Sequence, residues 1–166
     1  INAISALPLL AMRNLNVPYD HPSWERQPPD VYWYQFADQL LWERGNDVVQ
    51  MLFLARLPVV FLTLGLALVG FRWARQMWQS RFAAHLAFLF ILFDPNVLAN
   101  GRYVTTDLGG TLFIFLATFL LWRLWQQPGW SWRHWAAAVV GMGLAFGSKL
   151  SALAFVPIWA VMAVLP

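Results

Sequence analysis

Long uncharged runs of apolar residues constrain this chain more than any other feature. The five clearest runs cover residues 57–71, 82–93, 108–122, 135–147 and 152–165. Flanking aromatic and small residues lengthen each run towards the roughly 20 residues that a perpendicular membrane span needs. His85 is the one titratable side chain inside them. We therefore predict an all-α integral membrane protein with about five transmembrane helices.

The composition agrees with a membrane setting and excludes several classes of protein. Of the 166 residues, 60% are hydrophobic and 11% are charged, whereas soluble domains usually carry about 25% charged residues. The net charge of +3 comes from scattered basic residues rather than a basic face, so we expect no nucleic-acid partner. The absence of cysteine leaves no disulfide framework, zinc finger or thiol nucleophile.

The first third of the chain differs from the rest, because it holds six of the eight acidic residues. Residues 31–44 place apolar side chains on one helical face and charged ones elsewhere. This pattern predicts a short amphipathic helix on the membrane surface. We divide the chain into residues 1–50, an outer (periplasmic or lumenal) loop with this interfacial helix, and residues 51–166, a transmembrane helical segment.

Basic residues gather at alternate junctions between the predicted spans. The second and fourth junctions contain no acid and five arginines, namely Arg72, Arg75, Arg81, Arg123 and Arg133. The other junctions mix acids with cations or contain a single cation. The positive-inside rule therefore places the arginine-rich junctions in the cytoplasm. The polar first third, the junction from Arg102 to Asp107, and Lys149 are then predicted to face outward.

Asp107 and Arg102 are candidate site residues in the third junction. A carboxylate such as Asp107 at the start of an uncharged run is costly and usually has a partner or a function. Alternatively, it serves the N-terminus of a helix as a cap or first-turn acid. Arg102 offers a planar fork suited to phosphate or carboxylate. Alternatively, it anchors to lipid headgroups or forms a structural ion pair with Asp94 or Asp107.

Three further ionisable residues lie in or beside the spans. Lys149 lies between two apolar runs, where its ammonium is suited to bind a lipid phosphate at the outer face. Alternatively, it is a loop lysine in a hairpin turn. Arg56 precedes Leu57–Pro58 at the start of a span, where arginine commonly acts as an anchor. His85 is expected to be packed or hydrogen-bonded rather than a metal ligand. No residues show metal-ligand spacing, so we predict no metal site.

Three motifs occur in a characteristic order. They are Arg56-Leu57-Pro58, then the segment from Asp94 to Asp107 (DPNVLANGRYVTTD), then the segment from Gly143 to Lys149 (GLAFGSK). In order and spacing the chain resembles the membrane glycosyltransferases of the GT-C fold. The resemblance is to family 39 and its bacterial relatives, the superfamily of dolichyl-phosphate-mannose protein mannosyltransferases and aminoarabinose transferases, and it covers about residues 50–166.

The resemblance implies transfer of a sugar from a polyprenyl-phosphate donor to a protein hydroxyl or a lipid-linked acceptor. The reaction would take place at the outer face, in the bacterial cytoplasmic membrane. Asp107 matches the second acidic position beside the active site, and Lys149 matches the lysine near the donor phosphate. Arg102 would support the site, and Arg56 is also assigned to substrate binding. Membrane lipids are expected partners, and no cofactor is assigned beyond the lipid-phosphate-linked donor itself.

One departure from the family pattern concerns its principal acidic motif, often Asp-Glu, which we do not find. The catalytic base is therefore expected upstream of Ile1, and the chain is expected to be a fragment that is inactive alone. Two other functions are alternatives for such a chain. A transporter or flippase segment would place ionisable residues at mid-span. A non-catalytic membrane scaffold would let Arg102, Asp107 and Lys149 point apart.

Overall fold

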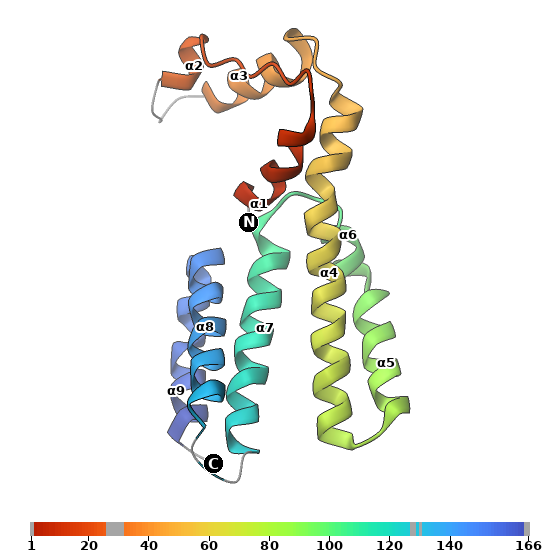
Figure 1. The fold of residues 1–166 in the computed structure, drawn as a ribbon, viewed down its shortest axis with the longest axis vertical. Helices are drawn as coiled ribbons and strands as arrows, with labels where there is room; N and C mark the ends of the chain where they lie inside the picture. The colour runs from red at the N-terminus through yellow and green to blue at the C-terminus, as the bar shows by residue number, and fades with distance from the viewer. Residues whose placement is uncertain (1, 26–31, 127–128, 130, 165–166) are drawn as a thin grey trace. The chain divides into compact units, whose positions relative to one another are not determined.

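The computed structural model describes residues 2–25, 32–126, 129 and 131–164, and every regular element in them is a helix (Figure 1). The predicted all-α class is therefore confirmed for this part of the chain. The chain divides into two compact units, Ala3–Pro58 and Val59–Pro166 together with Ile1–Asn2. The long helix α4 (Val48–Trp78) belongs to both. The predicted division at residue 50 concerns membrane topology and stays a prediction.

Short helices make up the unit Ala3–Pro58. In chain order they are α1 (Asn2–Ala6), the 3₁₀ helix η1 (Leu7–Ala11), α2 (Pro22–Glu25), α3 (Tyr32–Asp38) and the π-helical turn η2 (Gln39–Glu43). Helices α3 and η2 follow without a break, so the helix predicted over residues 31–44 is present as Tyr32–Glu43. Its place on a membrane surface stays a prediction.

The turn after η2 is held by hydrogen bonds of one asparagine. Gly45 has a φ of 68°, a left-handed conformation that glycine adopts without strain. The side-chain amide of Asn46 donates to Leu40 O at 2.7 Å and to Asn16 O at 2.9 Å. In return, Asn16 N donates to Asn46 Oδ1 at 2.8 Å. These bonds tie the start of α4 to the loop that precedes α2.

Helices form at all five predicted runs of the second unit. After α4 come α5 (Arg81–Leu92), α6 (Pro95–Asn100), α7 (Thr106–Trp125), α8 (Trp132–Ser148), the 3₁₀ helix η3 (Leu150–Phe155) and α9 (Val156–Val164). Within the described residues, α4 and α7 are long and apolar enough to cross a membrane, whereas α5 and the stretch from η3 through α9 are shorter. Two candidate spans are therefore supported, and the count of five is not confirmed.

Prolines explain two of the short helices. Asp94 has an extended backbone, with ψ at 128°, because the ring of Pro95 disfavours a helical residue before it. Helix α5 therefore ends at Leu92 instead of running on. Pro157 has no N–H to bond to the carbonyl four residues earlier, and the apolar run around it begins as the 3₁₀ helix η3 before it becomes α9.

Helix α7 packs against two groups of partners. One buried cluster joins it to α8, η3 and α9, and contains Ala117, Leu121, Ala138, Ala145, Ala152 and Trp159. A second cluster joins it to α4, and contains Val59, Leu66, Leu108 and Leu112. Small residues dominate the first cluster and let helix backbones approach closely, as is common between membrane helices. Helix α7 is thus the central element of this unit (Figure 1).

The arginine-rich junctions lie at one end of this unit. The rings of Trp73 in α4 and Trp122 in α7 are 6.1 Å apart, which brings the last turns of the two helices to the same level. Arg123, in the last turn of α7, lies 3.5 Å from His134 in the first turn of α8. The last turns of α4 and α7 therefore lie at the same end of the unit, where α5 and α8 begin (Figure 1). Which membrane face that end meets stays a prediction.

Candidate functional site

The opposite end of the unit holds an ion pair between Asp107 and Lys149. Asp107 lies in the first turn of α7, and Lys149 joins α8 to η3. The Lys149 ammonium donates a hydrogen bond to Asp107 Oδ1 across 42 sequence positions. Because α7 and α8 pack as antiparallel neighbours, the start of one meets the end of the other. The structure thus brings together two of the predicted site residues.

Backbone hydrogen bonds on both sides hold Lys149 in place. Its N–H donates to Ala145 O at 3.1 Å, which closes the last turn of α8. Its carbonyl accepts from Ala152 N at 3.0 Å, which opens η3. Between these two bonds the backbone of Lys149 is extended, with φ at −154° and ψ at 129°. The break between the two helices therefore turns this side chain towards α7.

Asp107 does not cap α7, although a cap was one interpretation of its sequence position. The N-cap residue is Thr105, whose side chain makes no capping hydrogen bond. Asp107 instead bonds to Lys149, and its backbone carbonyl accepts from Thr111 Oγ1 at 2.9 Å. As an acid in the first turn it is still favoured by the helix dipole. The side chains of Asp107 and Lys149 are 54% and 40% exposed, so a ligand can reach both.

Arg102 lies between α6 and α7 and takes no part in this ion pair. Its guanidinium lies over the ring of Tyr103, 5.3 Å from the centroid. Asp94, one candidate partner, instead caps α6 by accepting from Asn96 N at 2.9 Å and Val97 N at 3.0 Å. Neither ion pair recorded in the described part of the chain includes Arg102. Its exposed guanidinium donates from Nη2 to Tyr103 Oη at 3.5 Å and keeps further N–H groups that can bind an anion.

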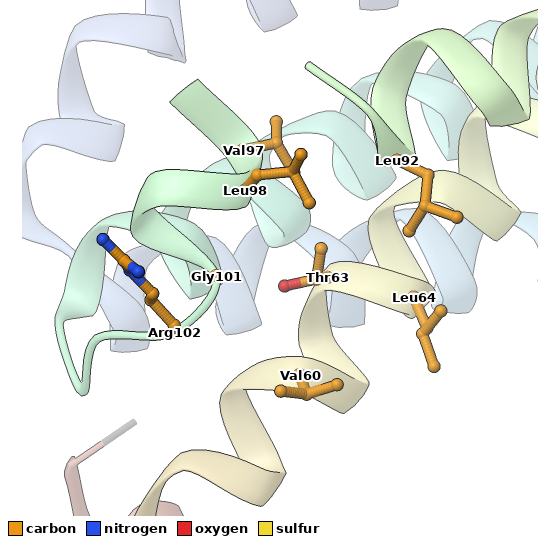
Figure 2. Close-up of a pocket in the computed structure, with 8 residues that line it drawn as sticks. All are labelled: Val60, Thr63, Leu64, Leu92, Val97, Leu98, Gly101 and Arg102. Atoms are coloured by element: carbon orange, nitrogen blue, oxygen red, sulfur yellow. The ribbon is translucent and has the colours of Figure 1, made fainter. Parts of the chain in front are cut away.

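A hollow of about 240 Å³ lies beside Arg102 (Figure 2). It is lined by Val60, Thr63, Leu64, Leu92, Val97, Leu98, Gly101 and Arg102. In Figure 2, the Arg102 side chain stands at the margin and extends away from the apolar ones. The hollow therefore combines a hydrocarbon-lined interior with one cation at its edge.

Sequence reasoning missed the role of Thr63 in this hollow. Thr63 is buried, and its hydroxyl donates to Val59 O at 3.0 Å. A Cβ placed on Gly101 would lie 2.7 Å from Thr63 Oγ1, so a glycine is required where the α6–α7 segment meets α4. Thr63 is the one polar side chain in the run 57–71. A single polar residue in a long apolar run is therefore the sequence feature that could have pointed to Thr63.

Arg56 and His85 belong to other parts of the chain. Arg56 is an exposed residue of α4 in the unit Ala3–Pro58, whereas the ion pair and the hollow belong to the other unit. Its role in substrate binding therefore stays a prediction. His85 Nδ1 lies 2.7 Å from Arg81 O, and its ring packs edge-on against Phe71 at 5.3 Å. It is a hydrogen-bonded helix residue, as expected.

The charged side chains of this end can bind an anion beside an apolar surface. The Lys149 ammonium pairs with the Asp107 carboxylate, and the Arg102 guanidinium stands at the edge of an apolar hollow. Among the described residues, no group of three or more His, Asp or Glu side chains could hold a metal ion. A phosphate attached to a hydrocarbon chain is a ligand that suits such charges.

Comparison with known proteins identifies one related family. The family model described as "Dolichyl-phosphate-mannose-protein mannosyltransferase" matches residues 30–165. This range includes all of the candidate site residues Arg56, Arg102, Asp107 and Lys149. Neither the curated proteins nor the solved structures yield a match to the chain.

Proposed function

Because this chain belongs to the dolichyl-phosphate-mannose-protein mannosyltransferase family, we propose that it transfers a sugar from a polyprenyl-phosphate donor. The acceptor is a hydroxyl group of a protein or of a lipid-linked molecule. Family membership supports a membrane glycosyltransferase of the GT-C type. The donor, the acceptor and the membrane face are our proposals. The ion pair of Asp107 and Lys149 is the observation that chiefly supports a site for the donor phosphate.

In the proposed reaction, the acceptor oxygen forms a bond to the anomeric carbon of the sugar. The bond from that carbon to the phosphate oxygen breaks, and its electron pair stays on the polyprenyl phosphate. The acceptor proton passes to a base. Negative charge therefore grows on the leaving phosphate, and a cation placed there lowers the barrier.

Lys149 is proposed to stabilise this growing charge. Its ammonium is half-exposed, and its carboxylate partner Asp107 orients it from α7. A donor phosphate can approach the ammonium, because an ammonium has three N–H groups and Asp107 Oδ1 accepts one hydrogen bond. Asp107 is proposed to act beside the reacting sugar as the second acidic group of the site.

Arg102 is proposed to support donor binding at the same end. Its guanidinium stands at the edge of the apolar hollow, where a lipid can place a hydrocarbon portion inside and a phosphate outside. Arg56 is proposed as an additional substrate-binding residue on the strength of its sequence motif. Both assignments predict weaker donor binding when the guanidinium is removed.

We propose that this end faces outward from a bacterial cytoplasmic membrane. The arginines of the α4–α5 and α7–α8 junctions lie at the other end, which supports a cytoplasmic location for that end. A transporter is disfavoured, because Asp107 and Lys149 lie at helix ends rather than at mid-span. A scaffold in which the candidates point apart is disfavoured by the ion pair of Asp107 and Lys149, although Arg102 takes no part in that pair.

The proposal is tested with Lys149→Ala and Asp107→Asn in the protein expressed from its complete gene. Loss of one preorganised charge donor typically costs about 100- to 1,000-fold in turnover, and we expect a loss of that size from Lys149→Ala. The rate of transfer is expected to fall by about 100-fold or more in the Asp107→Asn variant. Transfer is measured in membranes with a radiolabelled polyprenyl-phosphate sugar.

Matched controls are Arg133→Ala, which removes a cation from the arginine-rich end, and Asp38→Asn, which removes an exposed carboxylate from α3. Both are expected to retain transfer. All four variants are expected to insert into membranes at the level of the unchanged protein. Transfer at near-normal rates by both Lys149→Ala and Asp107→Asn would overturn the site assignment.

A further inference from the structure

The stem of Lys149 follows the surface of α7 on its way to Asp107. Gly110 lies three residues after Asp107, and residues with this spacing share one face of a helix. Gly110 is itself buried. The face of α7 that carries the carboxylate therefore also carries a position with no side chain, directly under the lysine.

The contact at Gly110 is close. A Cβ built there would lie 3.2 Å from Lys149 Cβ, 3.4 Å from Cδ and 3.9 Å from Cγ. Three carbon atoms of the lysine stem thus pass over the glycine. Because backbone hydrogen bonds to Ala145 and Ala152 hold Lys149 on both sides, its Cβ has little freedom to retreat from an added methyl group.

Helix stability does not account for a glycine at this position. Glycine in a helix interior costs about 1 kcal/mol relative to alanine. By contrast, Gly143 in α8 has nothing within 4 Å of an added Cβ, so space alone would permit a side chain there. Gly110 differs from it because an atom of a candidate site residue occupies the space that a side chain would fill.

We propose that Gly110 is a positioning residue for Lys149. Because Gly110 has no side chain, the lysine stem can lie against α7 and its ammonium can reach Asp107. The inference deepens the proposed function, since it matters for catalysis only if Lys149 acts on the donor phosphate. Gly110 itself touches neither donor nor acceptor. A side chain there would push the lysine stem away from α7 and break its hydrogen bond to Asp107.

The experiment uses the graded series Gly110→Ala and Gly110→Val, with Gly143→Ala and Gly143→Val as matched controls for helix propensity. A displacement of about 1 Å at a catalytic group can cost about 100-fold in rate. We expect a several-fold fall in kcat for Gly110→Ala and at least about tenfold for Gly110→Val, with smaller changes in KM. The Gly143 variants are expected to retain both parameters.

A second readout measures position without activity. Lys149 is the one lysine of the sequence, so acylation by an amine-reactive reagent, followed by mass spectrometry, reports its accessibility directly. We expect faster labelling in Gly110→Val than in the unchanged protein, and Asp107→Asn serves as the positive control. The Gly143 variants are expected to label at the unchanged rate.

The two readouts separate the two proposals. Unchanged labelling and unchanged kcat in Gly110→Val would overturn the positioning role, even if Lys149→Ala abolishes transfer. Faster labelling with unchanged kcat would support the positioning role and contradict the action of Lys149 on the donor. If only Gly110→Val fails to fold, the labelling rate and kcat of Gly110→Ala decide whether Gly110 positions Lys149.

Discussion

Lys149 donates a hydrogen bond to Asp107 and thereby joins the end of α8 to the first turn of α7, 42 positions earlier in the chain. Both side chains are about half-exposed. Ion pairs with that exposure contribute about 0–1 kcal/mol to stability, because water screens the charges. The pair is therefore better suited to orienting an ammonium than to holding the helices together.

Exchanging the two charges tests this distinction. In the double variant Asp107→Lys with Lys149→Asp, we expect the free energy of unfolding to change by less than about 1 kcal/mol. Transfer is expected to be lost, because the ammonium then projects from α7 instead of from the α8–η3 junction. Thermal unfolding in detergent and the transfer assay measure the two quantities, and full activity of the exchanged pair would contradict the assigned roles.

Helix packing in the second unit depends on Gly141. A Cβ there would lie 3.0 Å from Leu120 Cδ1 and 3.3 Å from the Cα of Ala117, and the latter belongs to the backbone of α7 and cannot rotate aside. Gly141→Ala is expected to lower stability by about 1–3 kcal/mol through overpacking. Gly143→Ala on the same helix is the control, and it should show no loss. Equal unfolding temperatures for the two variants would refute the close approach.

A hydrogen bond between two helices is the basis of another prediction. Trp159 Nε1 in α9 donates to Thr118 Oγ1 in α7 at 3.0 Å, and that hydroxyl donates to Ile114 O at 2.8 Å. Such bonds in membrane proteins contribute about 0.6 kcal/mol on average. Trp159→Phe and Thr118→Val are each expected to destabilise the protein, and their double variant by less than the sum. If the changes in the free energy of unfolding were strictly additive in this double-mutant cycle, the hydrogen bond would contribute nothing to stability.

The unit Ala3–Pro58 contains a measurable ion pair of its own. Arg44 Nη2 donates to Asp20 Oδ1 at 2.7 Å, and this hydrogen bond lowers the pKa of Asp20 below its ordinary value of 3.8. Because the folded-state pKa is the lower one, the pair stabilises this unit above about pH 4, and the contribution is lost as the pH falls through the folded pKa. Arg44→Gln is expected to raise the Asp20 pKa, measured by carboxyl NMR, whereas Arg13→Gln should leave it unchanged.

The proposed orientation is testable by cysteine labelling, because residues 1–166 contain no cysteine. Gln76→Cys lies in exposed sequence near the end of α4, and Asn100→Cys lies in exposed sequence at the end of α6. An impermeant maleimide added to intact cells is expected to label Asn100→Cys and to spare Gln76→Cys until the membrane is opened. The reverse pattern would invert the proposed topology.

The family and the helical class could be predicted from sequence because both follow from local patterns. The order of motifs around Arg56, Asp107 and Lys149 was sufficient to indicate the family that the comparison then confirmed. The number of spans was harder to predict, since hydropathy alone does not show where a helix stops. Pro95 ends α5 early, and Pro157 turns part of the last run into a 3₁₀ helix.

The candidate site was predictable as a set of residues and not as an arrangement. Arg102, Asp107 and Lys149 could each be singled out, because an isolated charge beside a long apolar run is costly. Their partners could not be assigned. Asp94, a conceivable partner of Arg102, caps α6 instead. The contact of Thr63 with Gly101 joins two helices and cannot be inferred from either segment alone.

The sequence by itself determined which charged side chains are present and that the helices suit a membrane. Both follow from composition and residue order, which contain the apolar runs and the rare charges. The tertiary structure decided which of those charges meet. Antiparallel packing of α7 and α8 brings Lys149 to Asp107, and the missing side chain of Gly110 lets it arrive. Such contacts depend on the approach of two backbones far apart in the chain, which no local pattern encodes.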